Sequence, residues 1–159
     1  MKIKDVMVKT PAVCSPETNL GTAVEIMWNR NCGFLPVLDA ERSVGGVVTD
    51  RDIAIALGSK NRLPGEITVA EVATRKVHSC RPEYDIHMAL DSLAENKVRR
   101  LVVVNELNQL EGVLSMDDVV HFAETTPGVK AELSSVAVLR TLKTLYGFQL
   151  SPRTAAAVA

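Results

Sequence analysis

The chain has 159 residues, which suits one domain or two small units that share a core. Hydrophobic residues make up 47% of it but aromatic residues only 4%, so a core must be built from aliphatic side chains. The net charge of −1 argues against nucleic-acid and membrane-surface binding, and three cysteines argue against a disulfide scaffold. No signal peptide or bilayer-spanning stretch is apparent, so we expect a cytoplasmic protein without a membrane partner.

The sequence repeats itself at a fixed offset of 66 residues, as from Gly46 to Gly112. When residues 2–54 are placed on residues 68–120, ten pairs are identical. A chain of this composition would give roughly four by chance. The identical residues of the first copy are Val6, Cys14, Pro16, Glu17, Ala23, Leu35, Val37, Gly46, Val47 and Asp52. Such a duplication predicts two similar units related by pseudo-two-fold symmetry.

In chain order, each copy is predicted to begin with a short amphipathic segment and a brief extended segment. The amphipathic segments are residues 3–7 and 69–73, and the extended segments are residues 12–14 and 77–79. A proline follows each extended segment within three residues and favours extended geometry just before it.

A helix and a pair of strands are predicted next. Apolar residues at the i, i+3, i+4 and i+7 spacing begin at Leu20 and Ile86, directly after the N-cap candidates Asn19 and Asp85. The strands are expected at residues 34–38 and 44–49, and again at 100–104 and 110–115. A second helix begins at residues 50–52 and at 117–118, where acidic side chains suit a helix N-terminus.

The residues after Thr126 have no counterpart in the first copy. Pro127 and Gly128 break the chain, and apolar residues at helical spacing then predict an amphipathic helix over residues 129–146, ended by Gly147.

Each copy therefore reads β-α-β-β-α, and the predicted fold is α+β (α/β-like). Two such repeats bury their sheets against each other, because one alone is too small for its own core. The predicted boundaries are 1–58 for the first repeat, 59–67 for the linker, 68–126 for the second repeat, 127–148 for the C-terminal helix and 149–159 for a disordered tail. Turn-forming residues at 58–65 indicate that the connection between repeats is exposed.

One motif ends the strand pair of both copies: GVVTDRD at residues 46–52 returns as GVLSMDD at residues 112–118. Its glycine permits a close backbone approach. The Thr or Ser hydroxyl and the first free amides of the following helix predict an anion site. The Asp one helical turn later can accept hydrogen bonds from a vicinal diol such as ribose.

Residues 1–124 resemble a pair of CBS domains (cystathionine-β-synthase type repeats), the tandem unit called a Bateman module. The strings FLPV at residues 34–37 and VGGVVTDRD at residues 44–52 carry the resemblance. It implies a module that binds an adenosine-containing ligand (AMP, ADP, ATP or S-adenosylmethionine) and regulates an attached or partner protein. Since such modules commonly pair into a flat disc, it also implies a homodimer.

The resemblance assigns roles to residues at matching positions. Thr49 with Asp52, and Ser115 with Asp118, match the phosphate- and ribose-contacting positions of the family. The positions where adenine usually packs match Ala12, Val13 and Cys14 in the first copy and Val77, His78 and Cys80 in the second. The remaining candidates for ligand contact are Phe34, Leu35, Pro36, Leu101, Arg99 and Arg100.

The two copies differ where nucleotide-binding members of the family are often basic. The pair before the Leu-x-Val strand is Arg99 and Arg100 in the second copy but Gly33 and Phe34 in the first. Because a polyphosphate needs paired positive charge, we expect one competent phosphate pocket and one that is weaker or differently selective. Alternation along a strand predicts that at most one of the two arginines points into a given pocket.

Simpler roles stay open for these residues. Asp52 and Asp118 could serve only as acidic residues at helix N-termini, and Thr49 and Ser115 could only satisfy strand-end backbone groups. The two arginines could form a solvated face.

No catalytic cofactor, metal site or reaction is expected. The cysteines at 14 and 80 are expected to be buried apolar side chains, and the scattered His and Cys residues have no metal-site spacing. The chain contains no Walker loop or dinucleotide fingerprint. The leading hypothesis is therefore a stand-alone sensor that binds its ligand in the cleft between repeats. The alternative is a ligand-free interaction scaffold that uses the C-terminal helix, with nucleic-acid binding disfavoured by charge.

Overall fold

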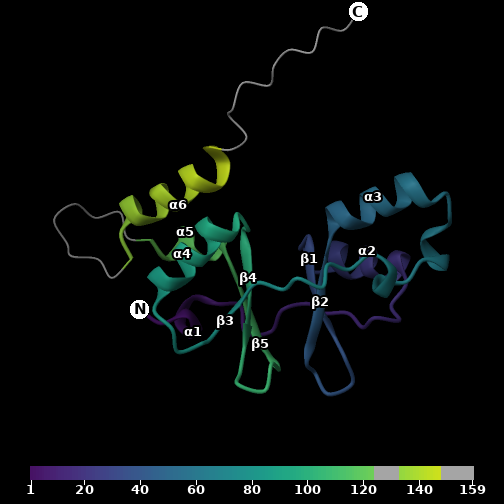
Figure 1. Cartoon of the computed structure of the whole chain (residues 1–159), viewed down its shortest axis with the longest axis horizontal. Coiled ribbons are helices and arrows are strands. Elements are labelled where there is room, and N and C mark those ends of the chain that lie inside the picture. Colours follow the sequence, from purple (N-terminus) through teal and green to yellow (C-terminus); the bar gives the residue numbers. More distant parts are fainter. Residues whose placement is uncertain (124–132, 148–159) are drawn as a thin grey trace, which may run out of the picture.

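The computed structural model describes residues 1–123 and 133–147, so the predictions for residues 124–132 and 148–159 lie outside the described part. Two similar halves stand side by side in Figure 1. The first contains α2 (Leu20–Asn29), β1 (Phe34–Leu38), β2 (Val44–Thr49) and α3 (Asp50–Lys60). The second contains β3 (Ser79–Cys80), α4 (Ile86–Asn96), β4 (Arg100–Val104), β5 (Leu110–Ser115), α5 (Met116–Phe122) and α6 (Ser135–Gly147). The short helical segments are α1 (Ile3–Val6), η1 (Pro64–Glu66) and η2 (Val69–Glu71).

The long strands and their preceding helices form where the sequence predicts them. Asn19 caps α2 by accepting a hydrogen bond from the Thr22 amide at 2.9 Å, and Asp85 caps α4 by accepting one from the His87 amide at 2.9 Å. In each half the two long strands form an antiparallel hairpin, β1 with β2 and β4 with β5. The mixed α+β character and the repeat are therefore confirmed.

The predicted extended segments are shorter than expected. In the second half, the predicted extended segment forms a strand only at Ser79 and Cys80, and this strand pairs with β4 in parallel. In the first half a single bridge joins Cys14 to Val37. The connection between the halves also differs, because α3 runs through Gly58 to Lys60 before the chain turns at residue 61.

The leading amphipathic segments are exchanged between the halves, which the sequence analysis did not predict. Ile3 and Val6 of α1 are buried in the core of the second half, whereas Val69 of η2 is buried in the core of the first. Backbone hydrogen bonds fix both, from the Ile3 amide to the Tyr84 carbonyl at 3.0 Å and from the Val69 amide to the Thr18 carbonyl at 2.8 Å. Each half therefore completes its core with residues from the other repeat.

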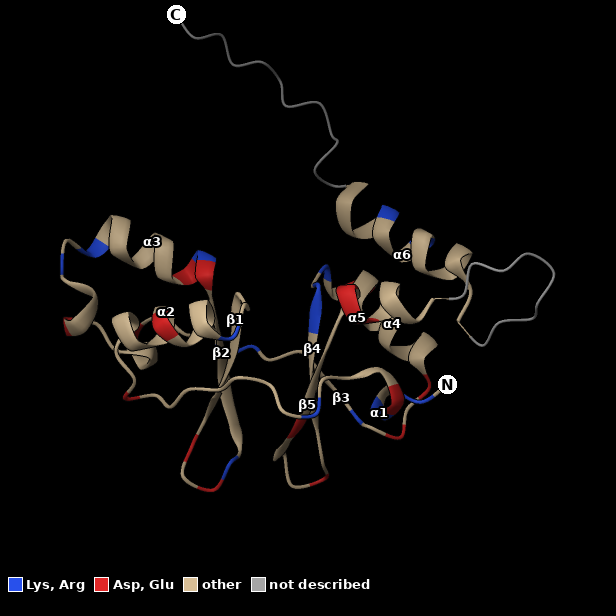
Figure 2. Ribbon diagram, turned by 180° about the vertical axis from the view of Figure 1, so that it is seen from behind, with Lys and Arg blue, Asp and Glu red and all other residues tan. Residues whose placement is uncertain are grey.

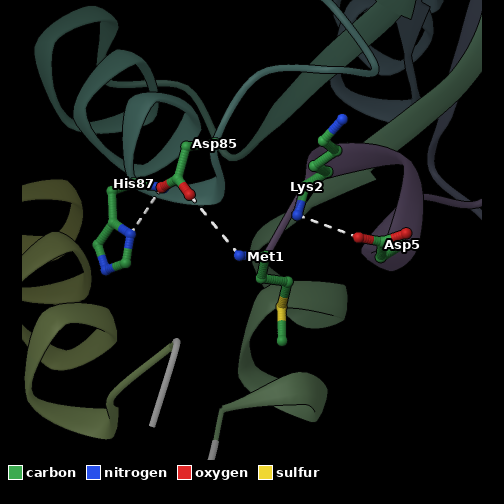
Figure 3. Close-up of polar contacts among 5 residues, drawn as sticks. All are labelled: Met1, Lys2, Asp5, Asp85 and His87. Carbon is green, nitrogen blue, oxygen red and sulfur yellow. Dashed lines mark hydrogen bonds and ion pairs between the residues drawn. The ribbon is translucent and has the colours of Figure 1, made fainter. Parts of the chain in front are cut away.

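Polar contacts hold the N-terminus against the start of α4 (Figure 3). The Met1 amine lies 3.7 Å from Asp85 Oδ2, and His87 Nδ1 lies 2.8 Å from Asp85 Oδ1. Hydrogen bonds from the His87 amide and ring lower the pKa of the Asp85 carboxyl, with the charged Met1 amine adding a smaller effect. The Lys2 amide donates to Asp5 Oδ2 at 3.1 Å and closes the turn of α1.

A separate apolar cluster lies at the seam between the two hairpins. Its buried members come from all four long strands: Leu38, Val44, Val102, Val104 and Leu110. The bridge between Ser43 and Gln109 continues this contact. The two sheets thus bury their surfaces against each other, as the size of a single repeat requires.

Candidate functional site

Two segments cross from one half to the other near the seam. Val8 exchanges backbone hydrogen bonds with Val113 of the second half at 2.9 and 3.0 Å, whereas Cys14 pairs with Val37 of the first half. Residues 9–13 therefore cross between the halves. The same path recurs 66 residues later, where Thr74 pairs with Val47 and residues 75–78 cross back. Each crossing segment forms a wall of one pocket.

The motif glycines accommodate these crossing segments. A Cβ atom on Gly112 would lie 2.7 Å from the Val8 carbonyl oxygen, and one on Gly46 would lie 3.1 Å from the Thr74 carbonyl oxygen. The close backbone approach expected at both positions is therefore present, and the approaching group is the chain itself.

The first pocket, here called the cationic pocket, has a volume of about 400 Å³. Its polar wall carries five Lys or Arg side chains and two Asp side chains. Figure 2 shows basic residues at the start of β4 and both signs of charge at the start of α3. Its lining residues are Gly33, Phe34, Val47, Thr49, Asp50, Arg51, Asp52, Thr74, Lys76, His78, Lys97, Val98, Arg99, Arg100 and Val102.

The second pocket, here called the neutral pocket, has a volume of about 360 Å³ and is the pseudo-symmetric counterpart of the first. It carries two arginines and two aspartates, so its charges balance. Its lining residues are Val8, Thr10, Pro11, Ala12, Arg30, Asn31, Cys32, Phe34, Arg100, Val113, Ser115, Asp117 and Asp118. The structure therefore brings one Thr/Ser-x-x-Asp pair to each pocket.

Each Thr/Ser-x-x-Asp pair forms a capping box. Asp52 Oδ2 accepts hydrogen bonds from the Thr49 amide at 2.9 Å and the Thr49 hydroxyl at 2.7 Å. The Asp52 amide donates back to the Thr49 hydroxyl oxygen at 3.2 Å. Ser115 and Asp118 repeat all three bonds, at 2.8, 2.6 and 3.1 Å. The capping role that the sequence left open is therefore real, and the same residues also line the pockets.

The first amides of α3 are not free to form the predicted anion site. The first three amides of α3 donate within the protein: Asp50 to the Gly33 carbonyl at 3.2 Å, Arg51 to Asp50 Oδ1 at 2.7 Å and Asp52 to Thr49 Oγ1. At α5, the Met116 amide donates to the Arg99 carbonyl at 2.9 Å. Since the first amides of α3 are satisfied, cationic side chains are the groups left to hold an anion in the pocket beside α3.

Some of the remaining predicted site residues line a pocket, and the others lie in the protein core. His78, Arg99 and Phe34 line the cationic pocket, and Ala12 and Phe34 line the neutral one. The other candidates lie behind the walls: Leu35, Pro36, Leu101, Cys14 and Cys80 are buried, and Val13 and Val77 pack on the seam cluster. Burial raises the pKa of Cys14 to about 11 and that of Cys80 to about 12, as expected for unreactive thiols.

Both predicted arginines line the cationic pocket. Arg100 is the first residue of β4, and Arg99 directly precedes it. Arg100 also lines the neutral pocket, and its guanidinium carbon lies 5.7 Å from the centre of the Phe34 ring.

Three basic residues from other segments also line the pockets and were not among the predicted site residues. Lys76 lies on a crossing segment, Lys97 follows α4, and Arg30 follows α2. Arg51 of the cationic pocket is replaced by Asp117 at the equivalent position of the neutral pocket. The replacement of Arg51 by Asp117 can be found in the sequence by comparing positions 66 residues apart. The crossing of residues 75–78, which brings Lys76 to the pocket, cannot be predicted from the neighbouring residues.

Neither a candidate metal site nor a membrane-spanning helix is found in the part of the chain that the structure describes. Residues 1–123 and 133–147 contain no group of three or more His, Cys, Asp or Glu side chains able to hold a metal ion. Within the same residues, no helix is both long and apolar enough to pass through a bilayer.

Comparisons with known proteins agree with this architecture. The chain is 31% identical over 116 residues to the CBS domain-containing protein YhcV of Bacillus subtilis, covering 73% of this chain and 81% of YhcV. Its structure is similar to that of CBSX2 in complex with AMP, with a TM-score of 0.66 and 28% identity over 76% of this chain and 93% of that one. CBSX2 comes from Arabidopsis thaliana.

The similarity also extends to a CBS domain protein of unknown function, TA0289 from Thermoplasma acidophilum. The TM-score is 0.71 at 21% identity, over 91% of this chain and 77% of that one, which supports the fold alone. The family profile described as CBS domain matches residues 3–59 and 69–124, one match for each copy of the duplicated sequence. The chain therefore belongs to the CBS domain family and carries two CBS domains in tandem.

Proposed function

We propose that this chain is a non-catalytic regulatory module that binds a phosphorylated adenosine ligand in the cationic pocket. The observation that carries the proposal is that five Lys or Arg residues line one pocket between the repeats together with Asp52: Arg51, Lys76, Lys97, Arg99 and Arg100. The AMP complex of the related protein CBSX2 supports the choice of ligand class. AMP, ADP and ATP fit the cationic lining best, and S-adenosylmethionine, which carries no phosphate, fits it less well.

Each part of the ligand has a counterpart in this pocket. The cationic side chains bind the phosphates by charge-assisted hydrogen bonds. Asp52 accepts from Thr49 through Oδ2, so Oδ1 is available to accept from the ribose hydroxyls. The apolar groups of Val47, Val98 and Val102 surround the base. The functional boundaries of the two repeats are proposed to be residues 1–58 and 68–126.

Ligand binding regulates by linking the repeats. The cationic pocket takes Thr49 and Asp52 from the first repeat and Lys76 and Arg99 from the second, so a bound ligand contacts both. It favours the arrangement in which these groups are closest and shifts the population toward it. A partner protein that distinguishes the two arrangements is then regulated by the ligand.

Isothermal titration tests the function. We expect AMP, ADP or ATP to bind, and Asp52→Asn to weaken binding on the order of tenfold or more, since a charged acceptor is lost while the cap geometry is kept. Asp118→Asn, the equivalent change in the neutral pocket, is the matched control and should leave this first binding event unchanged. Absence of heat with all three nucleotides and S-adenosylmethionine would reject the proposal.

A second candidate, an interaction or dimerisation scaffold, is favoured by one specific observation. A groove of about 550 Å³ lies between α2 and α3, and Trp28 on its rim is 84% exposed. On α6, Val136 and Leu139 are also exposed. Light scattering of Trp28→Ser and Leu139→Ser tests whether a homodimer forms through these faces, since loss of the dimer in either variant identifies its contact surface.

A further inference from the structure

Arg100 occupies a position shared by both pockets. It lines the cationic and the neutral pocket, as does Phe34, over whose ring its guanidinium lies. These two residues are equivalent in the duplicated sequence, being 66 positions apart. Their contact therefore lies beside the pseudo-two-fold axis, where a side chain can border both sites.

The other basic groups each belong to one pocket. Arg51, Lys76 and Arg99 line only the cationic pocket, and Arg30 lines only the neutral one. Among the described residues, the Arg100 guanidinium has no ion pair and no hydrogen bond, and its recorded contact is the Phe34 ring. A cation held by an aromatic face can turn toward a stronger anionic partner on either side.

Removal of Arg100 affects the two pockets unequally. The cationic pocket keeps four other Lys or Arg side chains. The neutral pocket keeps only Arg30 as a basic residue, against two acidic ones, Asp117 and Asp118. Without the Arg100 guanidinium, the neutral pocket therefore has an excess of negative charge and repels a phosphate.

We propose that Arg100 couples the two pockets: a phosphate bound in the cationic pocket takes its guanidinium and thereby weakens the binding of a second phosphorylated ligand in the neutral pocket. The neutral pocket then selects an uncharged nucleoside. This inference rests on the proposed function. By linkage, an anionic ligand in the neutral pocket weakens binding in the cationic pocket by the same factor.

Titration calorimetry measures this coupling. The affinity of the neutral pocket for AMP is determined twice: in the wild-type chain after the first AMP has bound, and in Asp52→Asn, where binding at the cationic pocket is weakened. We expect the wild-type value to be weaker on the order of tenfold, within the usual range of coupling between sites. With adenosine as the probe, the two values should agree, because no phosphate competes for the guanidinium.

Two arginine variants separate coupling from simple loss of charge. In Arg100→Gln the affinity of the neutral pocket for AMP should be equally low with and without Asp52→Asn, so that the difference between the two backgrounds disappears. The matched control is Arg99→Gln, which removes an adjacent arginine that lines the cationic pocket alone. It should weaken the first binding event and leave the coupling intact.

The outcomes are distinct for each claim. Equal neutral-pocket affinities for AMP in the wild type and in Asp52→Asn would overturn the coupling while leaving the proposed function intact. A coupling that persists in Arg100→Gln would assign it to another residue and equally overturn the proposal. Absence of AMP binding to the wild type would instead reject the proposed function itself.

Discussion

At the scale of single residues, the motif of each repeat has a clear structural role. The capping boxes of Thr49 with Asp52 and Ser115 with Asp118 fix the start of α3 and α5. The motif glycine admits the chain segment that arrives from the other repeat. A residue type can therefore recur in both copies for packing reasons, even where the pockets differ in charge.

Gly112→Ala should destabilise the protein because its Cβ would meet the backbone of the crossing segment. The nearest atoms would be the Val8 carbonyl oxygen at 2.7 Å and Met7 Sδ at 2.8 Å. We expect the free energy of unfolding to fall by about 1–3 kcal/mol, the usual cost of overpacking. Urea denaturation followed by circular dichroism measures it.

The matched variant is Gly58→Ala, within α3, where an added Cβ would meet no atom within 4 Å. Alanine is the better helix former, so the free energy of unfolding should rise by about 0.5–1 kcal/mol. Equal stability of Gly112→Ala and the wild type would show that the crossing segment can move away freely.

At the scale of elements, α1 shows how a short helix is tied to a core that is distant in sequence. The Lys4 ammonium lies 2.7 Å from Glu83 Oε1, and the Lys2 ammonium contacts Glu83 Oε2. The hydrogen bonds from Lys2 and Lys4 lower the pKa of Glu83 to about 2, from an ordinary value of 4.5. The second repeat has Thr68 and Ala70 at the positions equivalent to Lys2 and Lys4, so this ion-pair cluster is not duplicated.

This cluster predicts a pH dependence of stability. Because the pKa of Glu83 is lower in the folded protein, its contribution is complete above about pH 4.5 and is lost as the pH falls toward 2. Glu83→Gln should therefore lose less stability than the wild type between pH 5 and pH 2, as thermal unfolding at each pH will show. Glu17→Gln, the equivalent position of the first repeat, should keep the wild-type profile. Parallel profiles for all three proteins would contradict the assignment to Glu83.

The outer helical surfaces of the two halves also differ. α6 packs on α4 and α5 and buries Val138 in the second core, while the groove between α2 and α3 has no covering helix among the described residues. The duplicated scaffold is thus asymmetric on its outer surface as well as in its pockets.

At the scale of the whole molecule, the two repeats form one folding unit. The core of the first half needs Ile67 and Val69, and that of the second half needs Ile3 and Val6. Burial of these aliphatic side chains cannot occur within a single repeat.

Cleavage in the exposed connection should therefore separate two pieces that fold only together. We expect residues 1–60 and residues 61–159, each expressed alone, to lack a cooperative unfolding transition, and their mixture to regain one in circular dichroism. A first piece without residues 1–8 should fail to restore the transition. Cooperative unfolding of either piece alone would show that the exchanged segments are dispensable.

The repeat, the long strands, the capped helices and the Thr/Ser-x-x-Asp pairs could all be predicted from the amino-acid sequence. These features depend on local periodicity and on side chains within a few residues of one another. Three features became visible in the folded protein alone: α1 and η2 exchange halves, Lys76 and Arg99 line one pocket together with Thr49, and Arg100 lines both the cationic and the neutral pocket. A short apolar segment such as Ile3–Val6 could pack in either core. Packing and backbone hydrogen bonds between residues far apart in the chain place it in the core of the second half.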